Sequence, residues 1–209
     1  MEQYGITNPE YFRFLEADQT YMGFDQEWYA NYWKRLSGCG PTTGAHILYY
    51  CHQFVALREL PLIVASKQDA RAYMNKMWKY ITPSMQGVNT TSRFYKGMMK
   101  YAQQEQLPLH YAVCDIPKHH EQRPAWELVW SFLKDGLKQN IPVAFLNWDQ
   151  GTVKSLDSWH WVTIISMKQE ENQYQVEILD GGTSLWIDFH AWFQSTSLGG
   201  GLISFKLAE

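Results

Sequence analysis

A run of glycine and small polar residues leads straight into an apolar segment, and this junction constrains the fold more than any other feature of the chain. Residues 37–44 read SGCGPTTG, and residues 45–50 continue as AHILYY. Proline suits the first turn of a helix, and a stretch that is apolar on most sides is typical of a buried helix. The sequence therefore predicts a buried helix that begins at Cys39 and continues to about Leu57.

The thiol at this junction has a setting that suits a nucleophile. The first N–H groups of a helix are unpaired and carry the positive end of the helix dipole, which favours a thiolate. The glycines on both sides of Cys39 would let a substrate approach closely. This segment alone is equally consistent with a buried structural cysteine beside a glycine-rich turn.

A segment far downstream favours the catalytic interpretation. Residues 157–166 follow a period of two, which predicts a strand with His160 near its start. A polar turn and a second apolar run at 174–179 predict a hairpin that ends at Asp180. With the turn centred at residues 170–171, residue n pairs with about 341 minus n, so His160 lies opposite Gly181 and beside Asp180.

Cys39, His160 and Asp180 therefore form a candidate catalytic triad. A cysteine, a histidine and an aspartate that orients the imidazole are the groups needed for nucleophilic attack on an acyl carbon. Asp157 is a second candidate for the carboxylate, although the hairpin places Asp180 better. His46 lies two helical turns beyond Cys39, which is too far to serve as its base.

Four short motifs connect the chain with a known family: CGPTT at 39–43, PVAF at 142–145, WHWV at 159–162 and LDG at 179–181. They resemble the papain-like cysteine peptidases, and within these the bacteriocin-leader-processing, double-glycine peptidase-like branch. The resemblance extends from about Trp33 to Trp192. It implies Cys39 as the nucleophile, His160 as the general base and acid, and Asp180 as the orienting group.

The resemblance also implies an α+β, papain-like fold. Its N-terminal half would be helical, with a central helix that starts at the nucleophilic cysteine. This half would pack on a mostly antiparallel β-sheet formed by the C-terminal half. We therefore expect a single domain over residues 1–209, with a helical subdomain at about 1–105 and a sheet subdomain at about 106–209.

The chain departs from the family at one position that matters for catalysis. The family usually has a glutamine about six residues before the cysteine, and its amide helps to bind the oxyanion. Here that position is Trp33. Asn31 is the first candidate to replace it, followed by Gln26 and the indole N–H of Trp33. Loss of an oxyanion donor costs about 10²–10³ in turnover.

Periodicity and turn residues predict the remaining elements. Residues 9–35 are expected to form short helices or turns. Further helices are expected at 66–80, 92–104 and 125–139. Strands are expected at 107–116, 143–146, 160–165, 174–179, 183–188 and 202–205. The loop at 151–158 is expected to be a mobile wall of the cleft.

Composition limits the classes of partner. The net charge is −3 and no basic run is present, which argues against nucleic acid or an anionic membrane. No apolar run is long enough to span a bilayer, and the first residues lack a secretory signal pattern. The odd number of three cysteines fits free thiols and a cytoplasmic location.

Neither a cofactor nor a metal is expected. His119, His120 and Glu121 are adjacent, but no second pair of ligands follows at a usable spacing. A solvated loop is the better interpretation of this triplet.

The favoured function is a thiol hydrolase, a cysteine peptidase acting on a peptide or acyl substrate through an acyl-enzyme. Two alternatives stay open. The same acyl-enzyme could be passed to an amine, as in an acyl transferase. The absence of the usual glutamine motivates the other alternative, an inactive papain-like module that only binds.

Overall fold

The computed structural model describes residues 2–57 and 59–208 and contains one large antiparallel sheet. Its strands lie in the order β4-β9-β5-β6-β7-β8. Strand β6 is long enough to pair with two strands along the same edge, so that β5 pairs with its first half and β1 with its second half. The bounds are β4 (Leu109–Ile116), β9 (Gly200–Leu207), β5 (Val143–Asn147), β6 (His160–Glu170), β7 (Gln173–Asp180), β8 (Thr183–Asp188) and β1 (Glu2–Gly5).

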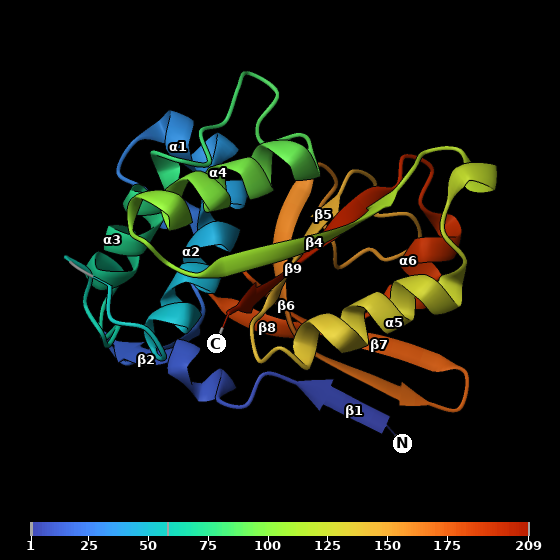
Figure 1. Ribbon diagram of the computed structural model, residues 1–209, viewed down its shortest axis with the longest axis horizontal. Coiled ribbons are helices and arrows are strands. Elements are labelled where there is room, and N and C mark those ends of the chain that lie inside the picture. Colours follow the sequence, from blue (N-terminus) through green and yellow to red (C-terminus); the bar gives the residue numbers. More distant parts are fainter. Residues whose placement is uncertain (1, 58, 209) are drawn as a thin grey trace.

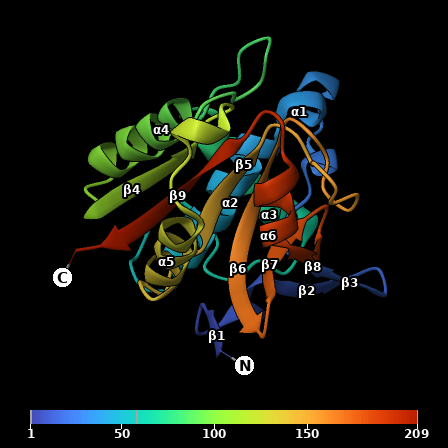
Figure 2. The same ribbon diagram turned by 90° about the vertical axis from the view of Figure 1, so that its right-hand side faces the viewer.

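Helices cover both faces of this sheet (Figures 1 and 2). The α-helices are α1 (Tyr32–Ser37), α2 (Cys39–His52), α3 (Lys67–Trp78), α4 (Thr91–Gln104), α5 (Trp126–Leu137) and α6 (Phe189–Ser195). Short 3-10 helices are η1 (Pro9–Phe12), η2 (Gln26–Trp28) and η3 (His120–Gln122). Helices α2 and α4 pack on one face of the sheet, whereas α5 and α6 pack on the other. The predicted α+β class, with a mostly antiparallel sheet, is confirmed.

The central helix α2 is buried almost completely. It begins at Cys39, as predicted, and every residue of it except Cys39 is buried. It ends at His52 rather than near Leu57, because a turn closes there with hydrogen bonds from Phe54 N and Val55 N to Cys51 O. Cys39, the nucleophile candidate, is therefore the one residue of this helix that is partly exposed.

Side-chain caps explain where the neighbouring helices start. The Ser66 hydroxyl accepts a hydrogen bond from Asp69 N at the start of α3. Thr90 caps α4 in the same way by accepting from Arg93 N. Such caps satisfy backbone donors that the helix itself leaves unpaired. The predicted helices at 66–80 and 92–104 are confirmed to within two residues at each end.

The predicted hairpin of β6 and β7 is also confirmed. Thr163 pairs with Leu179, and a bulge between Ile164 and Ser166 shifts the register by one residue. The observed pairs therefore sum to 342 before the bulge and 343 after it, close to the predicted 341. Gly181 and Gly182 then turn the chain into β8 with φ values of 55° and 72°, which few other residues adopt.

The N-terminal region differs from the prediction. Residues 9–35 contain a hairpin of β2 (Arg13–Glu16) and β3 (Gln19–Met22) in addition to short helices. These four-residue strands are too short to show a clear period, and Ala17 and Asp18 make the turn with positive φ. Strand β1 also joins the sheet from outside the predicted sheet subdomain, and α6 was not predicted at all.

Across the described residues, no helix is both long enough and apolar enough to cross a membrane.

Candidate active site

Cys39 occupies the first turn of α2, and two glycines are needed to pack this turn. A Cβ on Gly38 would lie 2.4 Å from the carbonyl oxygen of Lys34, and a Cβ on Gly40 would lie 2.7 Å from Cγ2 of Val88. Neither distance is tolerated, so larger residues would displace the backbone around the thiol. The glycines therefore serve close packing against α1 and the loop that carries Val88.

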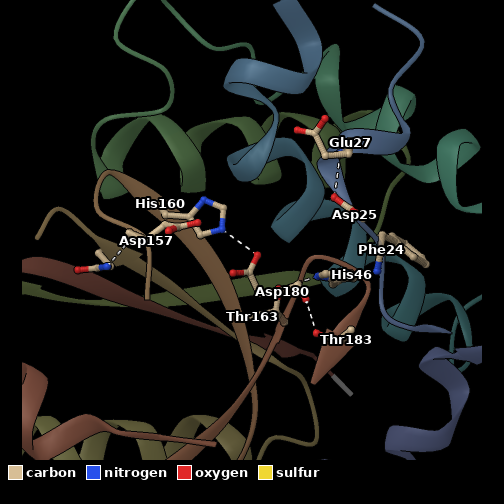
Figure 3. Close-up of polar contacts among 10 residues, drawn as sticks. Phe24, Asp25, Glu27, His46, Asp157, His160, Thr163, Asp180 and Thr183 are labelled. Carbon is tan, nitrogen blue, oxygen red and sulfur yellow. Dashed lines mark hydrogen bonds and ion pairs between the residues drawn. The ribbon is translucent and has the colours of Figure 1, made fainter. Parts of the chain in front are cut away.

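His160 and Asp180 meet at the end of the sheet that faces Cys39. The Nε2 atom of His160 lies 2.8 Å from Oδ1 of Asp180, and their side chains are 13% and 25% exposed (Figure 3). His160 is the first residue of β6, and Asp180 is the last residue of β7. Because Nε2 is held by the carboxylate, Nδ1 is the ring nitrogen left for Cys39.

The surroundings of His160 favour its charged form. Burial lowers its pKa, but the hydrogen bond to Asp180 and the electrostatic influence of the nearby Cys39 and Asp180 outweigh this effect and raise the pKa to about 10. The imidazole is therefore protonated at neutral pH. A protonated imidazole beside a thiol is the arrangement from which cysteine–histidine ion pairs form.

The three candidate triad residues line one narrow cavity of about 10 Å³, roughly the space of one water molecule. The same cavity is lined by Gln26, Thr42 and His46, among other residues. The side-chain oxygen of Gln26 is buried there and has no hydrogen-bond partner among the described residues. The unpaired oxygen is the acceptor of this amide, and the donor that an oxyanion would need is its Nε2 group.

The structure places the three candidates for the oxyanion donor in different pockets. Asn31, the first candidate, caps α1 by accepting a hydrogen bond from Lys34 N and lines a different pocket, so this prediction needs correction. Trp33 reaches Cys39 only from the opposite side, where both line a larger cleft. Gln26 is the candidate that shares the cavity with Cys39 and His160. Helix α1 lies between η2 and α2, which lengthens the expected spacing of about six residues to thirteen.

A larger cleft of about 230 Å³ opens on the other side of Cys39. Large apolar side chains that are unusually exposed surround it, with Met85 93%, Trp159 63%, Leu36 59% and Trp33 45% exposed. Val88 holds the loop that carries Met85 in place, because the carbonyl oxygen of Val88 accepts a 2.5 Å hydrogen bond from Nε1 of Trp161. Exposed apolar residues that gather around a cleft mark a binding surface.

Trp159 combines this exposure with an unusual backbone. Its φ of 59° lies in the left-handed region, and its ring stacks on Trp148 with centroids 6.2 Å apart. A bulky residue held in this conformation stores strain, which tends to occur at functional sites. The strained residue directly precedes His160, so the same turn presents the indole to the cleft and the imidazole to the thiol.

The loop at 151–158, predicted to be a mobile wall of the cleft, is anchored by hydrogen bonds and contributes no residue to the lining of the cleft. Asn147 donates a 2.7 Å hydrogen bond to the carbonyl oxygen of Asp157, and Thr152 N donates to Ser195 Oγ at 2.9 Å. The residues at its two ends, Trp148 and Trp159, form the cleft wall. Asp157 contributes its backbone carbonyl oxygen to the hydrogen bond with Asn147, whereas Asp180 is the carboxylate that contacts His160 (Figure 3).

The surroundings of the other two thiols keep them protonated. Burial raises the pKa of Cys51 to about 12, and burial together with Asp115 raises the pKa of Cys114 to about 11. All three cysteines are free. At neutral pH, Cys51 and Cys114 therefore remain protonated and unreactive.

The predicted triplet His119, His120 and Glu121 lies exposed around η3. His119 and Glu121 approach each other only to 3.9 Å. Within residues 2–57 and 59–208, no group of three side chains is arranged to hold a metal ion.

Comparison with known proteins gives a likeness to solved structures. No protein-family model matches the sequence, and no curated protein matches it. Among solved structures, the crystal structure of UfSP from C. elegans is similar over 100% of this chain, with a TM-score of 0.53 and 10% sequence identity. The chain spans about a third (35%) of the length of that chain. This likeness confirms the papain-like fold, whereas the bacteriocin-processing branch remains a prediction.

Proposed function

We propose that this protein is a thiol hydrolase of the cysteine peptidase type, which cleaves peptide or related amide bonds. The observation that carries this proposal is the meeting of Cys39, His160 and Asp180 in one cavity at the start of a buried helix. The papain-like fold adds support, because it is a fold on which thiol hydrolysis is expected.

The reaction follows from the positions of these groups. The Cys39 thiolate attacks the carbonyl carbon, and the carbonyl oxygen becomes an oxyanion. Protonated His160 gives its proton to the amine nitrogen as the C–N bond breaks, which leaves a thioester on Cys39. Water then attacks the thioester and passes a proton to His160, and the C–S bond breaks to release a carboxylic acid.

Two groups would stabilise the oxyanion. The backbone N–H of Cys39 is one of the unpaired donors at the start of α2. The amide of Gln26 would be the other, since it lines the same cavity. Asp180 would hold the imidazole in place and stabilise its charge throughout the cycle.

The apolar cleft beside Cys39 points to the kind of substrate. Met85, Trp159 and Trp33 offer large apolar surfaces to a group bound next to the scissile bond. An acyl or peptide substrate with a bulky apolar group at that position would bury these surfaces.

The first test is alkylation of Cys39 by iodoacetamide between pH 5 and 10, read by peptide mass mapping. The other two thiols should remain unlabelled at pH 7 because burial raises their pKa. We expect rapid labelling of Cys39 near neutral pH and much slower labelling in His160→Ala. A thiol that reacts like free cysteine in both proteins would overturn the proposal and leave the binding module.

Turnover separates the two enzymatic possibilities. Peptide and acyl-thioester libraries are incubated with the enzyme, with and without hydroxylamine, and the products are read by mass spectrometry. A hydrolase should release acids, and an acyl transferase should pass the acyl group to hydroxylamine more efficiently than to water. Cys39→Ala serves as the control, since it should abolish both products.

A further inference from the structure

His46 lies deep beside the candidate active site, although it is too far from Cys39 to act as its base. It belongs to α2, two turns after Cys39, and is only 2% exposed. Its ring lies between the backbone of Phe24 and the side chain of Thr163 (Figure 3). It lines the cavity that holds Cys39, His160 and Asp180.

The two hydrogen bonds of His46 determine its tautomer. The backbone N–H of Phe24 donates to Nε2 at 2.6 Å, so this nitrogen must carry the lone pair. The proton therefore lies on Nδ1, which donates to Oγ1 of Thr163 at 2.8 Å. Burial lowers the pKa of His46 to about 3, against the smaller opposing effect of Asp180, so the ring is neutral at physiological pH.

These contacts connect three elements that each supply one part of the candidate site. His46 is on the helix that carries Cys39, and Thr163 is on the strand that carries His160. Phe24 lies two residues before Gln26 and directly after Gly23. One imidazole thus links the nucleophile helix, the base strand and the segment of the oxyanion candidate.

The segment before Gln26 is shaped around this imidazole. Gly23 has a φ of 82°, and a Cβ at that position would lie 3.0 Å from Nε2 of His46. A side chain there would meet both an unfavourable backbone conformation and the histidine ring. The ring of Phe24 also packs on His46, with centroids 4.9 Å apart.

We infer that His46 is a positioning residue, which holds the segment 23–26 so that the amide of Gln26 faces the oxyanion. This inference rests on the proposed function, and it assigns the imidazole no direct contact with substrate. The acceptor Nε2 of His46, rather than a charge on its ring, holds the segment through the hydrogen bond from Phe24 N.

The test compares His46→Leu, which removes the acceptor, with His46→Gln, whose amide oxygen can accept from Phe24 N. Hydrolysis passes through an oxyanion, whereas alkylation by iodoacetamide does not. We expect His46→Leu to lower kcat by about 10- to 100-fold, part of the effect of losing an oxyanion donor. Alkylation of Cys39 should change by less than about threefold, and His46→Gln should recover most of the turnover.

A double-mutant cycle with Gln26→Ala shows whether the effect passes through this amide. In the Gln26→Ala background, His46→Leu should lower kcat by less than about twofold further. Equal losses in both backgrounds would overturn the inference. Gly23→Ala offers a second route should His46→Leu fail to fold, because it displaces the same segment and should show the same dependence on Gln26.

His52 provides the matched control. It is a second buried histidine of α2, and its Nδ1 contacts the hydroxyl of Tyr73, away from the cavity. His52→Leu should destabilise the fold while leaving the ratio of kcat to alkylation rate unchanged. An identical ratio change in His52→Leu would show that loss of stability explains the result and would overturn the inference.

A readout without catalysis keeps this inference separate from the proposed function. Amide hydrogen exchange at Phe24 should become at least about tenfold faster in His46→Leu, since the amide loses its buried acceptor. His46→Gln and His52→Leu should retain protection there. Protection that persists in His46→Leu would overturn the positioning role even if the protein hydrolyses no substrate.

Discussion

The replacement Asp180→Asn tests the electrostatic basis of the candidate site. Asparagine keeps an oxygen that can accept the hydrogen bond from Nε2 of His160 but removes the negative charge 2.8 Å away. An opposite charge at such a distance changes a pKa by about 1–3 units, and each unit corresponds to about 1.4 kcal/mol. The pKa of His160, about 10 in the native protein, should therefore fall by about 1–3 units.

The assay is an NMR titration of protein with isotope-labelled histidine rings, with the resonance assigned through His160→Gln. His46 should not titrate above pH 5, because burial lowers its pKa to about 3. The matched control is Asp157→Asn, which removes an exposed carboxylate three residues from His160. Its effect on the pKa of His160 should be smaller than about 0.3 unit, since solvent screens an exposed charge.

The same charge change should alter the dependence of stability on pH. The folded-state pKa of His160 lies above its ordinary value of 6.5, so the folded protein binds more protons between pH 6.5 and 10. This stabilisation is fully present below pH 6.5 and is lost as the pH rises through 10. Urea unfolding of Asp180→Asn should show a weaker decline over this window. An unchanged His160 titration in Asp180→Asn, or an equal shift in Asp157→Asn, would refute the reasoning.

Three further predictions follow from the site and its cleft. Gln26→Ala should lower kcat by about 10²–10³, because it removes the oxyanion donor. Asn31→Ala should leave kcat within about twofold and lower stability by only about 1 kcal/mol, because it removes a helix cap. Equal losses of kcat in the two variants would contradict the assignment of the oxyanion donor. The apolar cleft should also favour reagents that carry a benzyl ring. The ratio of the labelling rate with N-benzyl-iodoacetamide to that with iodoacetamide should be at least about tenfold higher for Cys39 than for N-acetylcysteine, because the cleft binds the ring. Met85→Ser should reduce this preference without changing the rate with iodoacetamide, and a preference that is absent in the native protein would argue against an apolar subsite. Gly40→Ala should destabilise the protein to urea by about 1–3 kcal/mol, since its Cβ would lie 2.7 Å from Val88, and unchanged stability would contradict the close packing of the nucleophile turn.

The sequence by itself was sufficient for features that depend on neighbouring residues. The glycine-rich junction and the apolar run after it identified the start of α2 at Cys39. The two alternating runs with a short polar turn identified the β6–β7 hairpin, and antiparallel pairing then placed His160 beside Asp180. These inferences succeeded because helix periods, strand periods and tight turns act over a few residues.

Short secondary-structure elements could not be predicted from these local patterns. The four-residue strands β2 and β3 and the seven-residue helix α6 contain too few residues for a period to emerge. Strand β1 carries no signal of its partner, because its pairing with β6 joins residues more than 160 positions apart, as Gly5 and Ser166 show.

Only the tertiary structure decided how the site is completed. Gln26 reaches the cavity of Cys39 because α1 folds away between them, a displacement that spacing along the chain does not reveal. His46 contacts Phe24 and also Thr163, which lies 117 residues further along the chain, and Val88 brings the loop of Met85 against Gly40. These contacts arise when helices pack on the sheet, since close packing brings together side chains whose separation in sequence carries no periodic signal.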